Sequence, residues 1–117
     1  ERIKAQTVEE VYKAIIAELK ERGSAGNAYA YLNSYNVLKS FNRDKPLHFT
    51  FSRIDADYLE KFEEWMRARG NKDTSMSFQM RTLRAVFNRA IKLKAVAREK
   101  NPFTDYKISR FNTRNGR

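Results

Sequence analysis

Apolar residues recur at helical spacing in four stretches of this chain, and the first stretch has the clearest limits. Thr7 and Glu10 have the spacing of a capping box, in which a hydroxyl and a carboxylate bind free backbone N–H groups at a helix start. Gly23 follows the stretch, and glycine is the residue that most often ends a helix. The apolar positions between these limits share one helical face: Val8, Val11, Tyr12, Ile15, Ile16 and Leu19. This stretch therefore predicts an amphipathic helix.

A second helix is predicted from about Gly26 to Phe41. Pro46 prevents the helix from continuing, because proline lacks the N–H group and clashes with the preceding turn. Between Leu47 and Ile54, apolar residues alternate with polar ones, which predicts a short extended strand or a tied-down loop. This segment is too short to form a sheet by itself. The apolar positions of the helix are these: Ala28, Tyr31, Leu32, Tyr35, Leu38 and Phe41.

The last two helices are predicted on either side of Gly70. The third begins at Asp55, whose carboxylate is a favourable N-cap, and Gly70 ends it. The fourth is the longest and extends from a cap at Asp73 or Thr74 to about Lys94. Their core positions are Leu59, Phe62, Trp65 and Met66 in the third, and Met76, Met80, Leu83, Phe87, Ala90 and Ile91 in the fourth.

Four amphipathic helices with short connections predict an all-α fold, a four-helix bundle with a short extended segment between the second and third helices. Asn101-Pro102-Phe103 closes the expected domain, which spans residues 1–103. Residues 104–117 are polar and basic with few apolar positions, and they predict a linker or tail. The length of 117 residues fits one domain.

Composition excludes several kinds of site. The chain has no Cys and a single His, His48, so a zinc site has no credible set of ligands. The sequence contains no phosphate-binding loop, dinucleotide-binding glycine motif or nucleophile elbow. We therefore expect no metal, no cofactor and no catalysis by this chain alone. No apolar run is long enough to span a membrane, and we expect a cytoplasmic protein without a membrane partner.

Positive charge is concentrated in the second part of the chain. Residues 1–70 contain 12 Lys and Arg against 11 Asp and Glu, whereas residues 71–117 contain 12 against 3. Such a local excess fits a polyanion such as nucleic acid, because Lys and Arg release the counterions condensed on phosphates. A solvated basic surface and a membrane-surface patch are the alternatives that charge alone leaves open.

Acidic residues are missing from two of the four predicted helices. Residues 22–43 and residues 74–98 contain no Asp or Glu, although the first and third helices are rich in both. A helix that lies against phosphates does not tolerate carboxylates at the contact, whereas a solvated helix benefits from mixed charge. The second and fourth helices are therefore predicted to face DNA together.

Polar residues on these two helices are the candidate DNA contacts. Arg binds guanine or phosphate, Asn and Gln bind adenine, and Ser and Thr bind either, so the residue types suit phosphates and base edges. Each of them taken singly could equally be an ordinary solvated residue, and only the pattern favours a function. The candidates are Asn27, Asn33, Ser34, Lys39, Arg43, Ser75, Ser77, Gln79, Arg81, Arg84, Asn88, Arg89 and Lys92.

The order and spacing of several short motifs resemble the SAM-like core-binding domain of phage and mobile-element tyrosine integrases. The most specific element is the run from Leu83 to Ile91 followed by Asn101-Pro102-Phe103, and the resemblance covers roughly Thr7 to Ile108. The other matching pieces are Gly23-Ser24, Tyr31, Leu38-Lys39-Ser40-Phe41, Phe49-Thr50-Phe51, Ile54-Asp55 and Leu59-Glu60-Lys61-Phe62-Glu63-Glu64-Trp65-Met66.

The resemblance implies one lobe of a two-lobed recombinase that closes around double-stranded DNA as a clamp. This lobe would lay two crossed helices across the major groove at the core of the attachment site. The catalytic lobe of the same parent chain, with its Arg, His and nucleophilic Tyr, would begin shortly after Arg117, and other recombinase protomers would join in the synaptic complex. The chain begins at Glu1 and not at Met, which also suggests part of a longer protein. The resemblance therefore leads us to expect DNA binding, and not strand cleavage, from this chain.

Two other readings of the residues are open. A helical transcription-factor or RNA-binding domain would be favoured by a tight helix-turn-helix pair, which the long Leu47 to Ile54 connection does not provide. A protein-interaction bundle or an accessory enzyme subunit would use the basic surface to bind an acidic protein. Salt-dependent binding to random duplex DNA separates these readings from the first.

Overall fold

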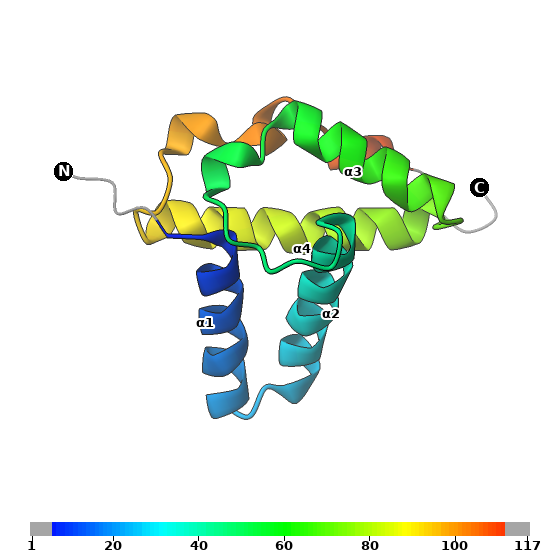
Figure 1. Cartoon of the computed structure of the whole chain (residues 1–117). Coiled ribbons are helices and arrows are strands. Elements are labelled where there is room, and N and C mark those ends of the chain that lie inside the picture. Colours follow the sequence, from blue (N-terminus) through cyan, green and yellow to red (C-terminus); the bar gives the residue numbers. More distant parts are fainter. Residues whose placement is uncertain (1–5, 112–117) are drawn as a thin grey trace.

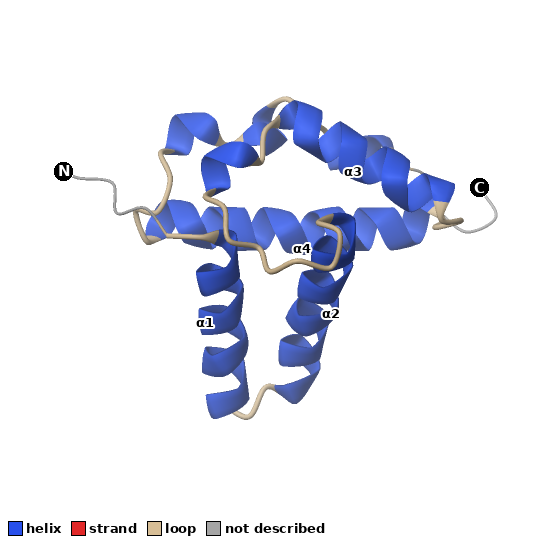
Figure 2. Ribbon diagram, in the orientation of Figure 1, coloured by secondary structure: helices blue, strands red, loops and turns tan. Residues whose placement is uncertain are grey.

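The computed structural model describes residues 6–111, and four α-helices form its framework. They are α1 (Val8–Glu21), α2 (Ala25–Phe41), α3 (Ala56–Ala68) and α4 (Asp73–Lys92). Single 3-10 turns lie at η1 (Phe51–Arg53), η2 (Arg98–Lys100), η3 (Pro102–Thr104) and η4 (Ile108–Arg110). The described residues contain no strand, and helices account for the regular structure seen in Figure 2. The predicted all-α, four-helix fold is confirmed.

The helices form two parts that meet along α4. Figure 1 shows α1 and α2 as an antiparallel hairpin, with α4 running across one end of both helices and α3 beyond α4. Contacts join α4 to each of the other three helices. The longest helix is thus the element against which the rest of the domain is assembled.

Local side-chain caps are present at two of the four helix starts, those of α1 and α3. The capping box at the start of α1 is present: the Thr7 hydroxyl accepts from the Glu10 N–H at 3.1 Å, and the Thr7 N–H donates to Glu10 Oε1 at 3.0 Å. Asp55 caps α3 by accepting from the Tyr58 N–H at 2.8 Å. The helix α2 begins one residue earlier than predicted, at Ala25.

The predicted cap of α4 is wrong. Asp73 is the first residue of the helix, and Lys72, which precedes it, makes no side-chain cap. The Asp73 carboxylate instead accepts from the Arg67 guanidinium at 3.4 Å, which links the start of α4 to α3. Asp73 therefore lies inside the helix, where its carboxylate pairs with the neighbouring helix and does not serve as the N-cap.

The segment between α2 and α3 is the tied-down loop and not the strand. The Val8 N–H donates to the Phe49 carbonyl at 2.8 Å, and the Glu9 N–H donates to the Leu47 carbonyl at 2.9 Å. The only strand-like pairing in the described part of the chain is one isolated bridge between Thr7 and Thr50. Because the first N–H groups of a helix have no intrahelical acceptor, this loop supplies the carbonyls that α1 lacks.

Aromatic and aliphatic side chains from all four helices form one core. The rings of Phe51 and Phe87 meet edge to face with centroids 5.4 Å apart, and both side chains are fully buried. This contact joins the loop before α3 to the middle of α4. The large side chains with almost no exposed surface are Tyr12, Leu38, Leu47, Phe51, Ile54, Leu59, Phe62, Met66, Met76, Met80, Leu83 and Phe87.

The described part of the segment expected to be a tail belongs to the folded domain. Tyr106, Ile108 and Phe111 are buried in the core, with exposed fractions of 4%, 8% and 7%. The Tyr106 hydroxyl donates to Glu63 Oε1 of α3 at 2.7 Å. Tyr106, Ile108 and Phe111 therefore pack on the folded domain and do not form a solvated tail. These three apolar residues lie in irregular turns, so they show no helical period in the sequence.

A buried carboxylate joins α1, α2 and the following loop. Glu9 accepts from the Tyr35 hydroxyl at 2.7 Å and from the Leu47 N–H at 2.8 Å, and Lys13 lies 3.1 Å away. Burial raises the pKa of Glu9, but the hydrogen bonds from Tyr35 and Leu47 and the contact with Lys13 outweigh it, so the pKa is lowered from 4.5. The ionised form of Glu9 is thus the form that stabilises the fold.

Replacing Phe87 tests the core directly. Because the ring is fully buried, Phe87→Ala should lower the free energy of unfolding by about 3–5 kcal/mol through lost burial and the cavity left behind. Chemical denaturation monitored by helical circular dichroism measures this loss. A variant as stable as the wild type would contradict the packing described.

Glu9 should make the stability depend on acid pH. A group whose pKa is lowered by folding contributes stability above its unfolded value, here near 4.5, and loses it as the pH falls through the folded value. We expect Glu9→Gln to be less stable than wild type at neutral pH and to show a shallower loss of stability below about pH 4.5. Denaturation at a series of pH values compares the slopes. Parallel slopes would exclude Glu9 as a source of acid sensitivity.

Candidate nucleic-acid interface

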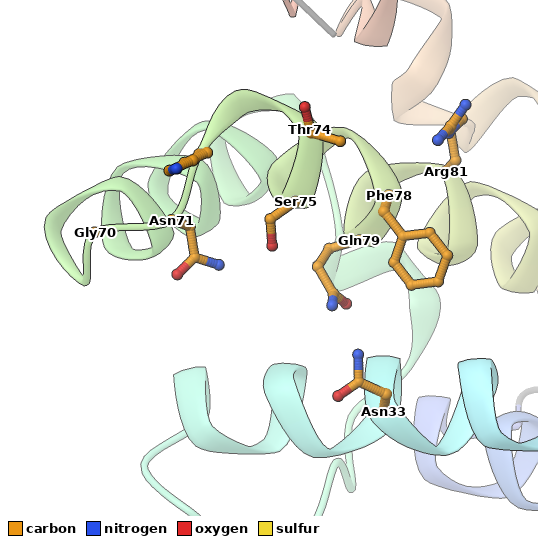
Figure 3. Close-up of a pocket in the computed structure, with 9 residues that line it drawn as sticks. Asn33, Gly70, Asn71, Thr74, Ser75, Phe78, Gln79 and Arg81 are labelled. Atoms are coloured by element: carbon orange, nitrogen blue, oxygen red, sulfur yellow. The ribbon is translucent and has the colours of Figure 1, made fainter. Parts of the chain in front are cut away.

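The two acid-poor helices α2 and α4 contact each other and border a shared open groove. This α2–α4 groove has a volume of about 640 Å³ and lies against the N-terminal half of α4 (Figure 3). Its lining residues are Asn33, Gly70, Asn71, Lys72, Thr74, Ser75, Phe78, Gln79 and Arg81. The two helices predicted to face one ligand therefore share one surface.

Cationic side chains form a stripe along the solvent face of α4. Arg81, Arg84 and Lys92 are exposed, and none of them makes an ion pair within residues 6–111. Together with the exposed Asn88, they are spaced by three and four residues, so they lie on one side of the helix. We call Arg81, Arg84 and Lys92 the α4 cation stripe.

The ion pairs of the described residues do not involve the α4 cation stripe. Four of the pairs lie within α1 and its C-cap or within α3, one joins α3 to Asp73, and one joins α1 to Arg89. None involves a residue of α2 or of the stripe, so the stripe is available to an external anion.

The comparison with protein-family models matches the phage integrase SAM-like domain to residues 7–108 of this chain. The chain belongs to this family. No curated protein and no solved structure matches the chain significantly. The match covers all four helices and extends into the C-terminal turns that pack on the core of this integrase SAM-like domain.

Membrane-spanning helices and metal-binding clusters are absent from the described residues of this integrase domain. None of the described helices combines the length and the apolar composition needed to cross a bilayer. Within the same residues, no three or more His, Asp or Glu side chains are grouped in a way that could hold a metal ion.

Arg89 differs from its neighbours on α4. Its guanidinium donates to Glu18 Oε1 of α1 at 2.9 Å, and its side chain is only 34% exposed. The hydrogen bond from Arg89 is the largest of the effects that lower the pKa of Glu18. Arg89 thus links two helices of the domain, a role that sequence spacing could not separate from that of Arg81 or Arg84.

Three small polar candidates lie beneath the surface of the integrase domain. Ser34 shares a hydrogen bond of 2.6 Å with the Tyr12 hydroxyl and so joins α2 to α1. Ser77 is also buried, with 4% of its surface exposed. Gln79 is buried to a similar degree, but it lies at the floor of the α2–α4 groove. Ser34 and Ser77 therefore do not present their hydroxyl groups to a ligand.

The remaining candidates are spread over the two helices. Asn27 is exposed and donates to Ser24 Oγ at 2.9 Å, at the end of α2 that Figure 1 shows farthest from α4. Lys39 is half-buried near the other end of α2. Arg43 lies beyond that end, at a second hollow that also contains Lys45 and Arg53. Of the α2 candidates, only Asn33 lines the groove, where α4 contributes Ser75.

The sequence pattern missed one prominent groove residue, Phe78. Its side chain is 39% exposed, which is unusual for a ring of this size. The core positions Met76 and Met80 lie two residues before and after it, and a helix turns by about 200° over two residues. The spacing itself therefore indicated that Phe78 points away from the core.

The different surroundings of Arg89 and Arg84 predict different effects on stability. Arg89→Ala removes the contact between α1 and α4 and should lower the melting temperature, whereas Arg84→Ala removes a solvated side chain and should leave it near the wild-type value. Thermal melts of the two variants at low and high salt measure the difference. Equal melting temperatures would show that the pair with Glu18 contributes nothing to stability.

Proposed function

We propose that this integrase SAM-like domain binds double-stranded DNA, as the core-binding lobe of a tyrosine-type site-specific recombinase. The observation that carries the proposal is the α4 cation stripe, which is exposed, free of ion pairs among the described residues, and adjacent to the groove shared with α2. Membership of the integrase family supports DNA as the polyanion.

The arrangement of the helices suits a duplex. Figure 1 shows α4 crossing the axis of α2, so the pair can extend along and across a major groove wide enough to admit a helix. Arg81, Arg84 and Lys92 would bind phosphates and set the position of the domain, whereas neutral polar groups in the groove would meet base edges. A catalytic lobe of the parent chain would clamp the opposite side of the attachment-site core, and further protomers would complete the synaptic complex.

The second candidate is DNA binding through a helix-turn-helix motif formed by α3 and α4, because only residues 69–72 connect these two helices. Such motifs place the second helix in the major groove while the first crosses the backbone. Exposed Asp57, Glu60 and Glu64 on α3 would then lie near phosphates, which disfavours this docking.

Salt dependence and charge removal test the proposal together. The logarithm of the association constant for a duplex should fall linearly with the logarithm of the salt concentration, with a slope of roughly −4 to −5 if about five phosphates are contacted. Arg81→Ala and Arg84→Ala should each weaken binding and reduce the magnitude of that slope by about one.

Lys61→Ala is the matched control, because it also removes one exposed cation but from α3, where Lys61 pairs with Asp57 at 3.4 Å. Fluorescence anisotropy with a labelled duplex measures all three variants. Unchanged affinity in both arginine variants, or a loss in the control as large as theirs, would refute the α4 contact.

A further inference from the structure

The floor of the α2–α4 groove contains a buried side-chain oxygen without a hydrogen-bond partner among the described residues. Gln79 is 5% exposed, and its Oε1 atom has no hydrogen-bond partner among the described residues. A buried acceptor without a donor is costly, so native proteins seldom keep one without a purpose. In Figure 3 the Asn33 amide projects from α2 toward Gln79, with no hydrogen bond between them. Two amides from different helices thus face the same space.

The aromatic ring of Phe78 and the guanidinium of Arg81 also belong to the surroundings of these two amides. Phe78, with 39% of its surface exposed, lines the same groove. Arg81 also contributes to the lining, but Figure 3 shows its guanidinium directed away from Asn33 and Gln79. Lys72 is a second cation among the lining residues. Asn33, Gln79 and Phe78 therefore offer neutral donors, neutral acceptors and an apolar surface in a groove that also carries two cations.

We propose that the α2–α4 groove reads the major-groove edge of an A·T base pair, with Gln79 and Asn33 binding adenine and Phe78 contacting the thymine methyl group. This proposal rests on the proposed function, since it names the base pair that the DNA-binding surface prefers. Adenine presents an N6 donor beside an N7 acceptor, which matches the oxygen and nitrogen of one side-chain amide.

The other bases fit this groove less well. Guanine presents two acceptors in the major groove and so cannot donate to Gln79 Oε1. Cytosine presents an amino donor but no adjacent acceptor for an amide N–H, and its pair lacks the methyl group that an aromatic ring contacts. Arginine is the usual partner of guanine, and the arginine of this groove points away from its floor.

Selection from a pool of duplexes with randomised sequence, using the full chain, identifies any preferred position. We expect wild type to enrich A·T at one position or more, with a ratio of affinities of roughly 5- to 150-fold over G·C, the range of one good bidentate contact. Gln79→Leu should bring that ratio close to one. Arg81→Ala should weaken binding to the A·T duplex and to the G·C duplex alike, so the ratio of the two affinities should stay at its wild-type value. Glu64→Gln, on the exposed surface of α3, is the control for substitution as such.

Base analogues assign the contacts at the selected position. Replacing adenine by 7-deazaadenine removes the N7 acceptor and should weaken wild type but not Gln79→Leu. Replacing thymine by uracil removes the methyl group and should weaken wild type but not Phe78→Ala. Circular dichroism and thermal melts confirm that each variant is folded before its ratio is interpreted.

The outcomes separate this inference from the proposed function. Salt-dependent binding without any A·T preference, or an A·T preference that survives Gln79→Leu in a folded variant, would overturn the inference and leave DNA binding intact. Failure of the wild type to bind any duplex would overturn the proposed function, and this inference with it.

Discussion

Burial of one face of α4 against the other three helices is the constraint on which the rest of this structure depends. Met76, Met80, Leu83 and Phe87 are almost fully buried. Burial of this kind is the main favourable contribution to folding, and it fixes the rotation of the helix about its axis. Once that rotation is set, Arg81, Arg84 and Lys92 must point to solvent. The core thus orients the cationic face, without any direct contact between the two.

Two buried carboxylates hold the connecting segments to this framework. Glu9 binds the Tyr35 hydroxyl and the Leu47 N–H, and Glu63 binds the Tyr106 hydroxyl and Arg67. Charged acceptors form stronger hydrogen bonds than neutral ones, and a buried charge must have partners. Each carboxylate therefore fastens an irregular segment to a helix. These contacts explain how loops with little regular structure become parts of one folded unit.

Ion pairing differs between parts of the surface. Lys13, Lys61 and Arg67 pair with acids of α1 and α3, whereas the α4 cation stripe makes no ion pair in the described part of the chain. An unmatched stripe costs little in water, where repulsion between exposed charges is screened. The proposed contact with DNA depends on this unmatched charge, because cations attract a phosphate backbone. Arg89 lies on the same helix as Arg81 and Arg84, but it pairs with Glu18 and so links α4 to α1.

The helices, the capping box at Thr7, the N-cap at Asp55 and the acid-free stretches could be predicted from sequence, because each depends on residues within a few positions of one another. The cap of α4 could not, since Asp73 is drawn to Arg67 of another helix. Packing of Tyr106 on Glu63 and pairing of Arg89 with Glu18 join residues 43 and 71 positions apart, and only the tertiary structure brings them together.

The candidate interface shows the same division. Residue types marked α2 and α4 as the faces toward an anion, but they could not tell that Ser34 and Ser77 are buried. They also could not show that Asn33 and Gln79 line one groove. Periodicity specifies which side of a helix is apolar, whereas the crossing of two helices, which depends on long-range packing, decides which polar residues meet.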